Sequence, residues 1–152
     1  MSAGANLATG FSSPDDSPGL LLWQVTNRWQ QAQRRALKPF KLTHVQFVLL
    51  ASLTWLEGDG PVTQRQLADH AATDPMMTSQ VLRNLETRRH VRRTRHPADR
   101  RAWALAVTAQ GRSLANRAVV AVEACDDRFF ASLGEGRPQF VEALRKLRPG
   151  AE

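Results

Sequence analysis

Arginine is concentrated in one stretch of this sequence, around a single aspartate. Seven arginines fall within residues 88–101, and Asp99 directly precedes Arg100 and Arg101. The whole chain carries 21 Lys and Arg against 14 Asp and Glu, a formal net charge of +7. A clustered basic surface attracts polyanions, of which nucleic acid is the simplest. A nearby carboxylate can accept a charge-assisted hydrogen bond, so we expect Asp99 to hold one guanidinium in a fixed direction.

The residues that follow the basic stretch are predicted to form a β-hairpin. Trp103, Leu105 and Val107 alternate with alanines, which is the period of two expected of a strand. Val91 begins an earlier candidate strand, and the turn residues 96–99 lie between the two. An arginine at the tip of such a wing can enter the narrow minor groove of DNA, where the potential is most negative. The predicted wing contacts are Arg95, His96, Asp99, Arg100 and Arg101.

Two short helices with a tight break between them precede the hairpin. Thr63 and Gln66 form a capping box before a helix expected over 64–71. Asp74 and Pro75 then give an N-cap and a first helical residue, and this second helix is expected to end near Arg88. The pattern is that of a helix-turn-helix, whose second helix reads the major groove. The residues predicted to face DNA are Pro75, Met76, Thr78, Ser79, Gln80 and Arg83, with Asn84 and Thr87 beside them, whereas Met77, Val81, Leu82 and Leu85 are expected to face inward.

Helical periodicity predicts four further helices around this unit. The first spans 18–37, and the second begins after a capping box at Thr43 and is apolar almost all round. A long helix is expected from Thr108 to near Gly134, followed by a last helix at 137–148. A three-helix winged domain cannot cover so much apolar surface alone. We therefore expect the terminal helices to pack against a second copy, as a symmetric dimer on a palindrome-like DNA site.

The predicted fold is mainly α with a small β-wing, a winged helix-turn-helix domain with N- and C-terminal dimerisation helices. Residues 1–18 are expected to be a flexible tail, and 19–148 a single subunit. Within that subunit, 43–108 would form the DNA-binding lobe, with dimerisation helices at 19–38 and 109–148. The sequence has no apolar run long enough to cross a bilayer and no secretory signal, so a cytoplasmic location without a membrane partner is expected.

This order of elements resembles the MarR (multiple antibiotic resistance regulator) family of bacterial repressors. The matching segments are 42–53, 62–86 and 96–112. The last contains a D-x-R wing motif, Asp99 and Arg101, and a T-x-x-G motif from Thr108 to Gly111. A departure is Arg89–His90, which stands where family members usually have Gly-Leu.

The resemblance implies a cytoplasmic homodimer that binds a pseudo-palindromic operator in double-stranded DNA. It also implies release by a small aromatic or phenolic ligand or, in some branches, by an oxidised cysteine. Asp99 and Arg101 would be the wing pair. Thr78, Ser79 and Arg83 would face DNA from the recognition helix.

Aromatic residues, one cysteine and four histidines could support further chemistry. Trp23, Phe47 and Trp55 are a candidate ligand pocket, although tryptophans are more often core or interface residues. The single cysteine, Cys125, lies on an apolar helical stripe next to two aspartates, which argues against redox sensing. The four histidines have no metal-binding spacing, and no catalytic arrangement is recognisable, so we expect no metal, no cofactor and no enzyme. Two alternatives to a ligand-released repressor stay open: a DNA-binding or architectural protein without an effector, and a winged helix that binds protein.

Overall fold

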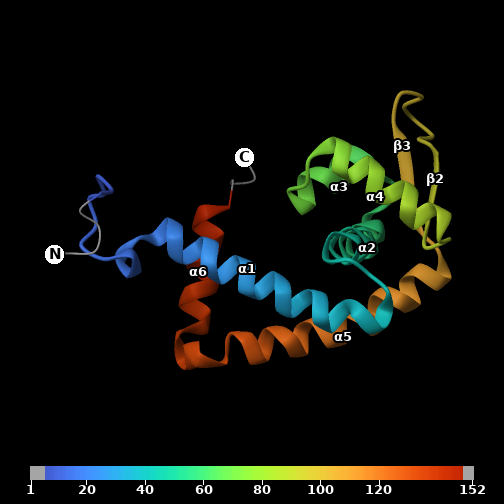
Figure 1. Cartoon of the computed structure of the whole chain (residues 1–152). Helices are drawn as coiled ribbons and strands as arrows, with labels where there is room; N and C mark the ends of the chain where they lie inside the picture. The colour runs from blue at the N-terminus through green and yellow to red at the C-terminus, as the bar shows by residue number, and fades with distance from the viewer. Residues whose placement is uncertain (1–5, 149–152) are drawn as a thin grey trace.

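The computed structural model describes residues 6–148 and has a mainly helical fold with one small sheet (Figure 1). The helices are α1 (Pro18–Leu37), α2 (His44–Leu56), α3 (Gln64–Ala71), α4 (Pro75–Thr87), α5 (Ala109–Phe129) and α6 (Arg137–Leu147). The strands are β1 (Val62–Thr63), β2 (Val91–Arg95) and β3 (Trp103–Val107). Short 3-10 turns occupy Pro14–Asp16, Lys38–Phe40, Glu57–Asp59 and Ala131–Gly136. The predicted fold class is confirmed, and the two-residue β1 is an element that sequence periodicity missed.

Capping residues fix where the helices begin. Thr43 and Thr63 each form the predicted capping box, with both reciprocal hydrogen bonds present. The Asp74 carboxylate accepts the N–H groups of Met76 and Met77, so α4 begins at Pro75 as expected. Thr108 caps α5 by accepting the N–H of Gly111.

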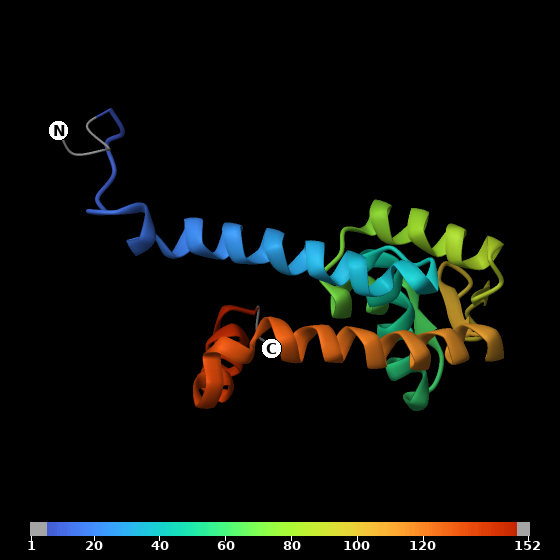
Figure 2. The ribbon, with the colours of Figure 1, turned by 60° about the horizontal axis from the view of Figure 1, so that its bottom comes forward.

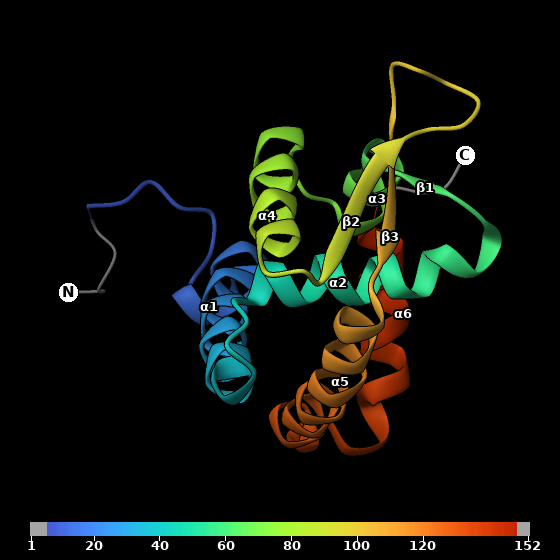
Figure 3. The ribbon, with the colours of Figure 1, turned by 90° about the vertical axis from the view of Figure 1, so that its right-hand side faces the viewer.

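The core surrounds α2, which crosses the middle of the lobe beneath α4 and the sheet (Figure 3). Leu49, Leu50 and Leu53 of α2 are completely buried. They pack with apolar residues of α3, α4, the sheet and α5 in one cluster. Helix α2 is therefore the buried central helix that its apolar sequence predicts, although Trp55 is 81% exposed near its C-terminal end.

The sheet is antiparallel, with strand order β1-β3-β2. In the β2–β3 hairpin, Val91 pairs with Val107 and Arg95 pairs with Trp103. Directly paired residues lie on the same face, so the buried end of the hairpin continues into a face that carries arginine and tryptophan. The loop from 96 to 102 forms the tip of the predicted wing.

Two long helices extend away from the lobe. In Figure 2, α1 and α5 run alongside each other, and α6 lies at the far end of α5. The prediction that α5 continues to near Gly134 is wrong, because α5 ends at Phe129 and Gly134 adopts a positive φ of 52° in the following 3-10 segment.

The N-terminal tail predicted for 1–18 falls only partly on described residues. Residues 1–5 lie outside them, as do 149–152. Within the described part, residues Pro14–Asp16 form a 3-10 turn capped by Ser13, and Pro18 already belongs to α1.

Candidate DNA interface

Helix α4 presents a polar face to solvent on the same side of the lobe as the wing (Figure 3). Pro75, Gln80 and Arg83 are exposed, Ser79 is half-buried, and Met76 is 84% exposed at the start of the helix. An Arg83 guanidinium nitrogen lies 3.4 Å from the Ser79 hydroxyl, to which it donates. Arginine, glutamine and short hydroxyl side chains match the donors and acceptors on base edges, and an exposed apolar group matches a thymine methyl.

The predicted orientation of Thr78 and Met77 is wrong. Thr78 is completely buried, whereas Met77 is 44% exposed. The Thr78 hydroxyl donates to the Asp74 carbonyl oxygen at 2.8 Å and lies 2.7 Å from the Thr73 hydroxyl. A hydroxyl with two such partners carries little desolvation cost, so Thr78 packs at the turn between α3 and α4 and does not face DNA.

The wing tip carries the predicted arginines, but Asp99 acts on backbone rather than on a guanidinium. Its carboxylate accepts the N–H of Arg101 at 3.0 Å, and its carbonyl accepts the N–H of Ala102 at 3.1 Å. Among the described residues, no ion pair involves Asp99. A short carboxylate side chain often bonds backbone two residues on, which makes a tight Asx turn. Asp99 therefore shapes the loop that holds Arg100 and Arg101.

His96 also contributes to the shape of the loop. Its Nδ1 accepts the N–H of Ala98 at 3.1 Å, and its own N–H donates to the Ala102 carbonyl at 3.0 Å across the base of the tip. The five predicted wing residues thus lie together at one hairpin end, with Arg95, Asp99, Arg100 and Arg101 exposed.

Sequence reasoning missed the role of Arg93 and Trp103. Both Arg93 and Arg95 place their guanidinium groups over the Trp103 ring, at 5.1 Å and 4.7 Å from its centre. The strand pattern could have indicated this contact. Arg93 and Arg95 are two residues apart and share one face of β2, and Trp103, which pairs with Arg95, lies on the same face.

The end of α4 is joined to the start of α5. Arg89 adopts a left-handed φ of 62°, and the N–H of His90 reaches back to the Leu85 carbonyl at 2.9 Å. This is a Schellman ending built on arginine where glycine is usual. The Thr108 hydroxyl donates to the Arg89 carbonyl at 2.7 Å. Gly111 lies so close to the His90 carbonyl that a Cβ would overlap it.

A polar cluster joins α1, α2 and α5 below the lobe. The Asp126 carboxylate accepts the indole N–H of Trp29 at 2.8 Å and the amide of the buried Gln33 at 2.6 Å. The His44 ring packs edge-on against Trp29, with ring centres 4.9 Å apart. Burial lowers the pKa of His44, and the nearby Arg34 adds to this effect, while Asp126 opposes it.

Cys125 lies in the core next to this cluster. Burial raises the pKa of its thiol, which the neighbouring Arg128 only partly offsets. A thiol of this kind is poorly nucleophilic, so the structure supports a packing role.

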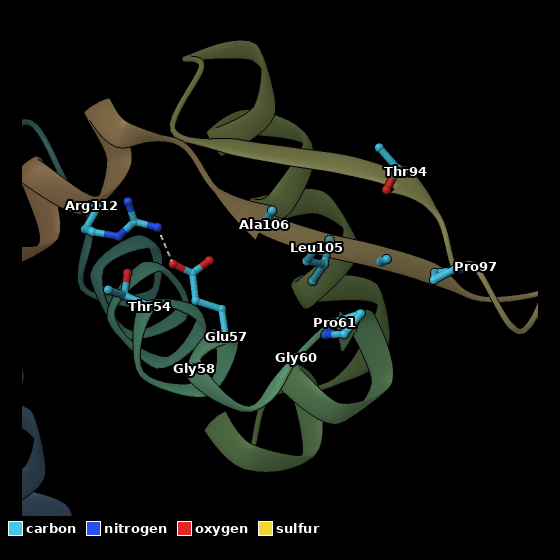
Figure 4. Close-up of a pocket in the computed structure, with 11 residues that line it drawn as sticks. Thr54, Glu57, Gly58, Gly60, Pro61, Thr94, Pro97, Leu105, Ala106 and Arg112 are labelled. Carbon is cyan, nitrogen blue, oxygen red and sulfur yellow. Dashed lines mark hydrogen bonds and ion pairs between the residues drawn. The ribbon is translucent and has the colours of Figure 1, made fainter.

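The candidate ligand residues do not form one pocket in the single subunit. Phe47 is buried in the core, whereas Trp23 is 68% exposed on α1 and Trp55 is exposed on α2. A groove of about 680 Å³ lies elsewhere, between β3, the end of α2 and the start of α5 (Figure 4). At its edge the Glu57 carboxylate pairs with Arg112 and accepts the N–H of Val107 at 3.0 Å.

Other kinds of site are not visible in the described part of the chain. Within residues 6–148, no cluster of three His, Cys, Asp or Glu side chains is placed to hold a metal ion. No helix in the same range combines the length and apolar character needed to span a bilayer.

Comparison with known proteins decides the family. The MarR family model matches residues 42–103. An uncharacterized HTH-type transcriptional regulator of Bacillus subtilis (strain 168), YdcH, is 41% identical over 90% of this chain and 93% of its own length. The chain belongs to the MarR family. It is accordingly a DNA-binding transcriptional regulator, and its relatives are named as regulators rather than as enzymes.

Solved structures of MarR proteins have the same fold. CouR from Rhodococcus jostii RHA1, bound to p-coumaroyl-CoA, superposes with a TM-score of 0.80 at 28% identity, over 92% of this chain and 99% of CouR. The Mycobacterium tuberculosis protein Rv2887, in complex with p-aminosalicylic acid, gives a TM-score of 0.68 at 32% identity, over 88% of this chain and 99% of Rv2887. The latter is also named an HTH-type transcriptional repressor.

Proposed function

We propose that this MarR protein is a cytoplasmic repressor that binds a pseudo-palindromic operator as a homodimer and leaves it when a small aromatic ligand binds. The observation that carries the DNA part is the common orientation of two surfaces. The exposed face of α4 and the arginine tip of the wing lie on one side of the lobe, and α4 contacts β2 directly. A helix in the major groove with a wing over the adjacent minor groove uses such an arrangement.

In this proposal the recognition helix contacts bases through Pro75, Met76, Ser79, Gln80 and Arg83. Arg83 is the side chain best suited to guanine, and Gln80 to adenine, because each can form two hydrogen bonds to the base edge. At the wing, Arg100 and Arg101 supply positive charge to the minor groove.

The homodimer is supported by the apolar surface of the terminal helices. Side chains left exposed on α1 and α6 are Leu20, Leu21, Leu22, Trp23, Val25, Val141, Leu144 and Leu147. Exposed apolar side chains in such number on the terminal helices mark an interaction surface, and a two-fold dimer would cover them on both copies. Two recognition helices would then lie about 34 Å apart, one turn of DNA.

The ligand is supported by relatives rather than by a cavity. CouR and Rv2887 were solved with p-coumaroyl-CoA and p-aminosalicylic acid, both of which contain an aromatic ring. A dimer would bring a second copy of Trp23 and its neighbours to the first, and in this proposal the ligand binds between the two copies.

The test is fluorescence anisotropy on labelled DNA from upstream of the protein's own gene, in a salt series with excess random competitor. We expect tight, competitor-resistant binding with two protomers per site, which a screen of aromatic acids reverses. Binding that no aromatic acid reverses would contradict the ligand part alone. Binding that any DNA competes away would favour an architectural role, and no binding at low salt would overturn the proposal.

A further inference from the structure

One indole on the wing lies against two guanidinium groups. Trp103 of β3 pairs directly with Arg95 of β2, and Arg93 is its diagonal neighbour on the same face. The guanidinium carbons lie 4.7 Å and 5.1 Å from the ring centre, within the range of cation–π attraction. Trp103 is partly exposed, so filling the core does not account for its size.

Arg93 connects this stack to α3 and α4, the two helices of the helix-turn-helix. Its Nε lies 3.4 Å from a carboxylate oxygen of Glu86 on α4. Its Nη1 donates to the side-chain oxygen of Gln64 on α3 at 3.1 Å. The Arg93 side chain is 16% exposed and that of Glu86 is 42% exposed, so salt screens this ion pair less than a fully exposed pair.

Arg95 connects the same stack to the wing tip. Its Nη1 donates to the Arg100 carbonyl at 2.8 Å. The next residue, Arg101, is held by Asp99 through its backbone N–H. A continuous series of contacts therefore runs from Glu86 on the recognition helix, through Arg93, Trp103 and Arg95, to the loop that carries the tip arginines.

We infer that Trp103 is a positioning residue of the DNA interface, which fixes the wing tip relative to the recognition helix through Arg95. This inference rests on the proposed DNA binding. Long arginine side chains lose rotamer freedom when they are ordered, and an indole face orders two of them before DNA arrives. The wing then meets the minor groove in one orientation, so less ordering remains to be done on binding.

The experiment is a double-mutant cycle on DNA affinity, using the full chain and its operator. Trp103→Leu keeps an apolar side chain and removes the aromatic face, Arg95→Ala removes the stacked guanidinium, and the third variant combines them. We expect Trp103→Leu to weaken binding about fivefold in the wild-type background. In the Arg95→Ala background the same change should cost less than twofold, because the guanidinium that links Trp103 to the wing tip is already gone and only Arg93 still stacks on the ring.

Two further variants separate positioning from folding. Trp103→Phe keeps an aromatic face and should retain most of the affinity. Arg92→Ala removes an equal charge from the opposite face of β2, where the paired residue is Ala106. The fold-loss in DNA affinity of the combined Arg92→Ala and Trp103→Leu variant should equal the product of the two separate losses, as expected for side chains that do not interact.

Each outcome bears on the inference. An equal loss from Trp103→Leu with and without Arg95 would show a merely structural residue and overturn it, while DNA binding itself stood. Equal losses from Trp103→Phe and Trp103→Leu would also overturn it. If the unsubstituted protein did not bind DNA, the proposed function would fail and this inference with it.

Discussion

The lobe and the terminal helices are both rich in leucine, but most leucines of the lobe are buried and several on the terminal helices are exposed. In the lobe, Leu49, Leu50 and Leu53 are completely buried, whereas Leu22 of α1 is 56% exposed and Leu147 of α6 is 77% exposed. The lobe covers its own apolar faces with α2 at its centre. The terminal helices have apolar side chains that no other element within residues 6–148 covers. An amphipathic pattern therefore identifies a face to be buried, but not which chain buries it.

The largest expected effect tests how tightly the lobe packs within one subunit. Gly111→Ala should lower the free energy of unfolding by about 3 kcal/mol, because the new Cβ would overlap the His90 carbonyl. This clash opposes the roughly 0.5–1 kcal/mol that alanine normally gains over glycine within a helix. Urea denaturation would measure it. Gly58→Ala, where a Cβ meets nothing within 4 Å, is the matched control and should change little.

The next effect tests the terminal helices. Leu22→Glu should weaken dimer association by roughly 2 kcal/mol, about 30-fold, because it places a charge in the expected interface. Sedimentation velocity over a concentration series would measure the shift to monomer. Gln24→Glu adds the same charge to another face of α1 and serves as control. Unchanged association in Leu22→Glu would show that this face does not join the copies.

At the wing, Arg101→Ala should weaken DNA binding by more than about 1 kcal/mol. The slope of log affinity against log salt should fall by about one, because the protein brings one cation fewer to the DNA and releases one counterion fewer. An anisotropy salt series would give both values. The monomer–dimer equilibrium should not move, which keeps the wing separate from the terminal helices. An isotherm identical to wild type would remove Arg101 from the interface.

Asp99 offers a sharper test, because charge and geometry predict opposite signs. Asp99→Ala should weaken DNA binding by about 1 kcal/mol although it removes a negative charge, since the Arg101 N–H loses its acceptor. Asp99→Asn keeps an oxygen acceptor and should bind as well as wild type or better. Tighter binding by Asp99→Ala would show that the turn does not matter for affinity.

The smallest effect concerns the end of the recognition helix. Arg89→Gly should raise the free energy of unfolding by roughly 0.5–1 kcal/mol, because the left-handed φ of 62° costs glycine nothing. Arg88→Gly is the control, since Arg88 has a φ of −80° and gains no such relief. In urea denaturation, the midpoint should shift upward for Arg89→Gly and downward for Arg88→Gly, relative to wild type.

Elements whose boundaries are set locally could be predicted from the sequence. Thr43, Thr63 and Asp74 cap their helices as predicted, since a cap depends on residues within one turn. The hairpin followed from strict alternation at Trp103, Leu105 and Val107. The sequence predicts too late an end for α5, because the residues after Phe129 are compatible with a helix until the turn at Gly134.

Features set by neighbours distant in the chain could not be predicted. Thr78 is buried and Met77 is exposed, the reverse of the prediction. The Thr78 hydroxyl can be buried because it has hydrogen-bond partners in Thr73 and Asp74, and helical periodicity does not reveal such partners. The sequence predicts that Asp99 lies in the wing but gives it a guanidinium as partner, whereas the backbone N–H of Arg101, two residues away, binds its carboxylate. The stack on Trp103 required the strand register, which fixes Arg95 opposite it.

Helix α5 begins at the cap that joins it to the recognition helix and ends beside the terminal turn before α6. Its 21 residues make a rigid rod of roughly 31 Å. A tilt of about 5° over that length moves one end by roughly 3 Å, close to the rise of one base pair. In a dimer joined at the terminal helices, the angle of α5 sets the distance between the two α4 helices. That distance decides whether both can enter consecutive major grooves on one side of the DNA.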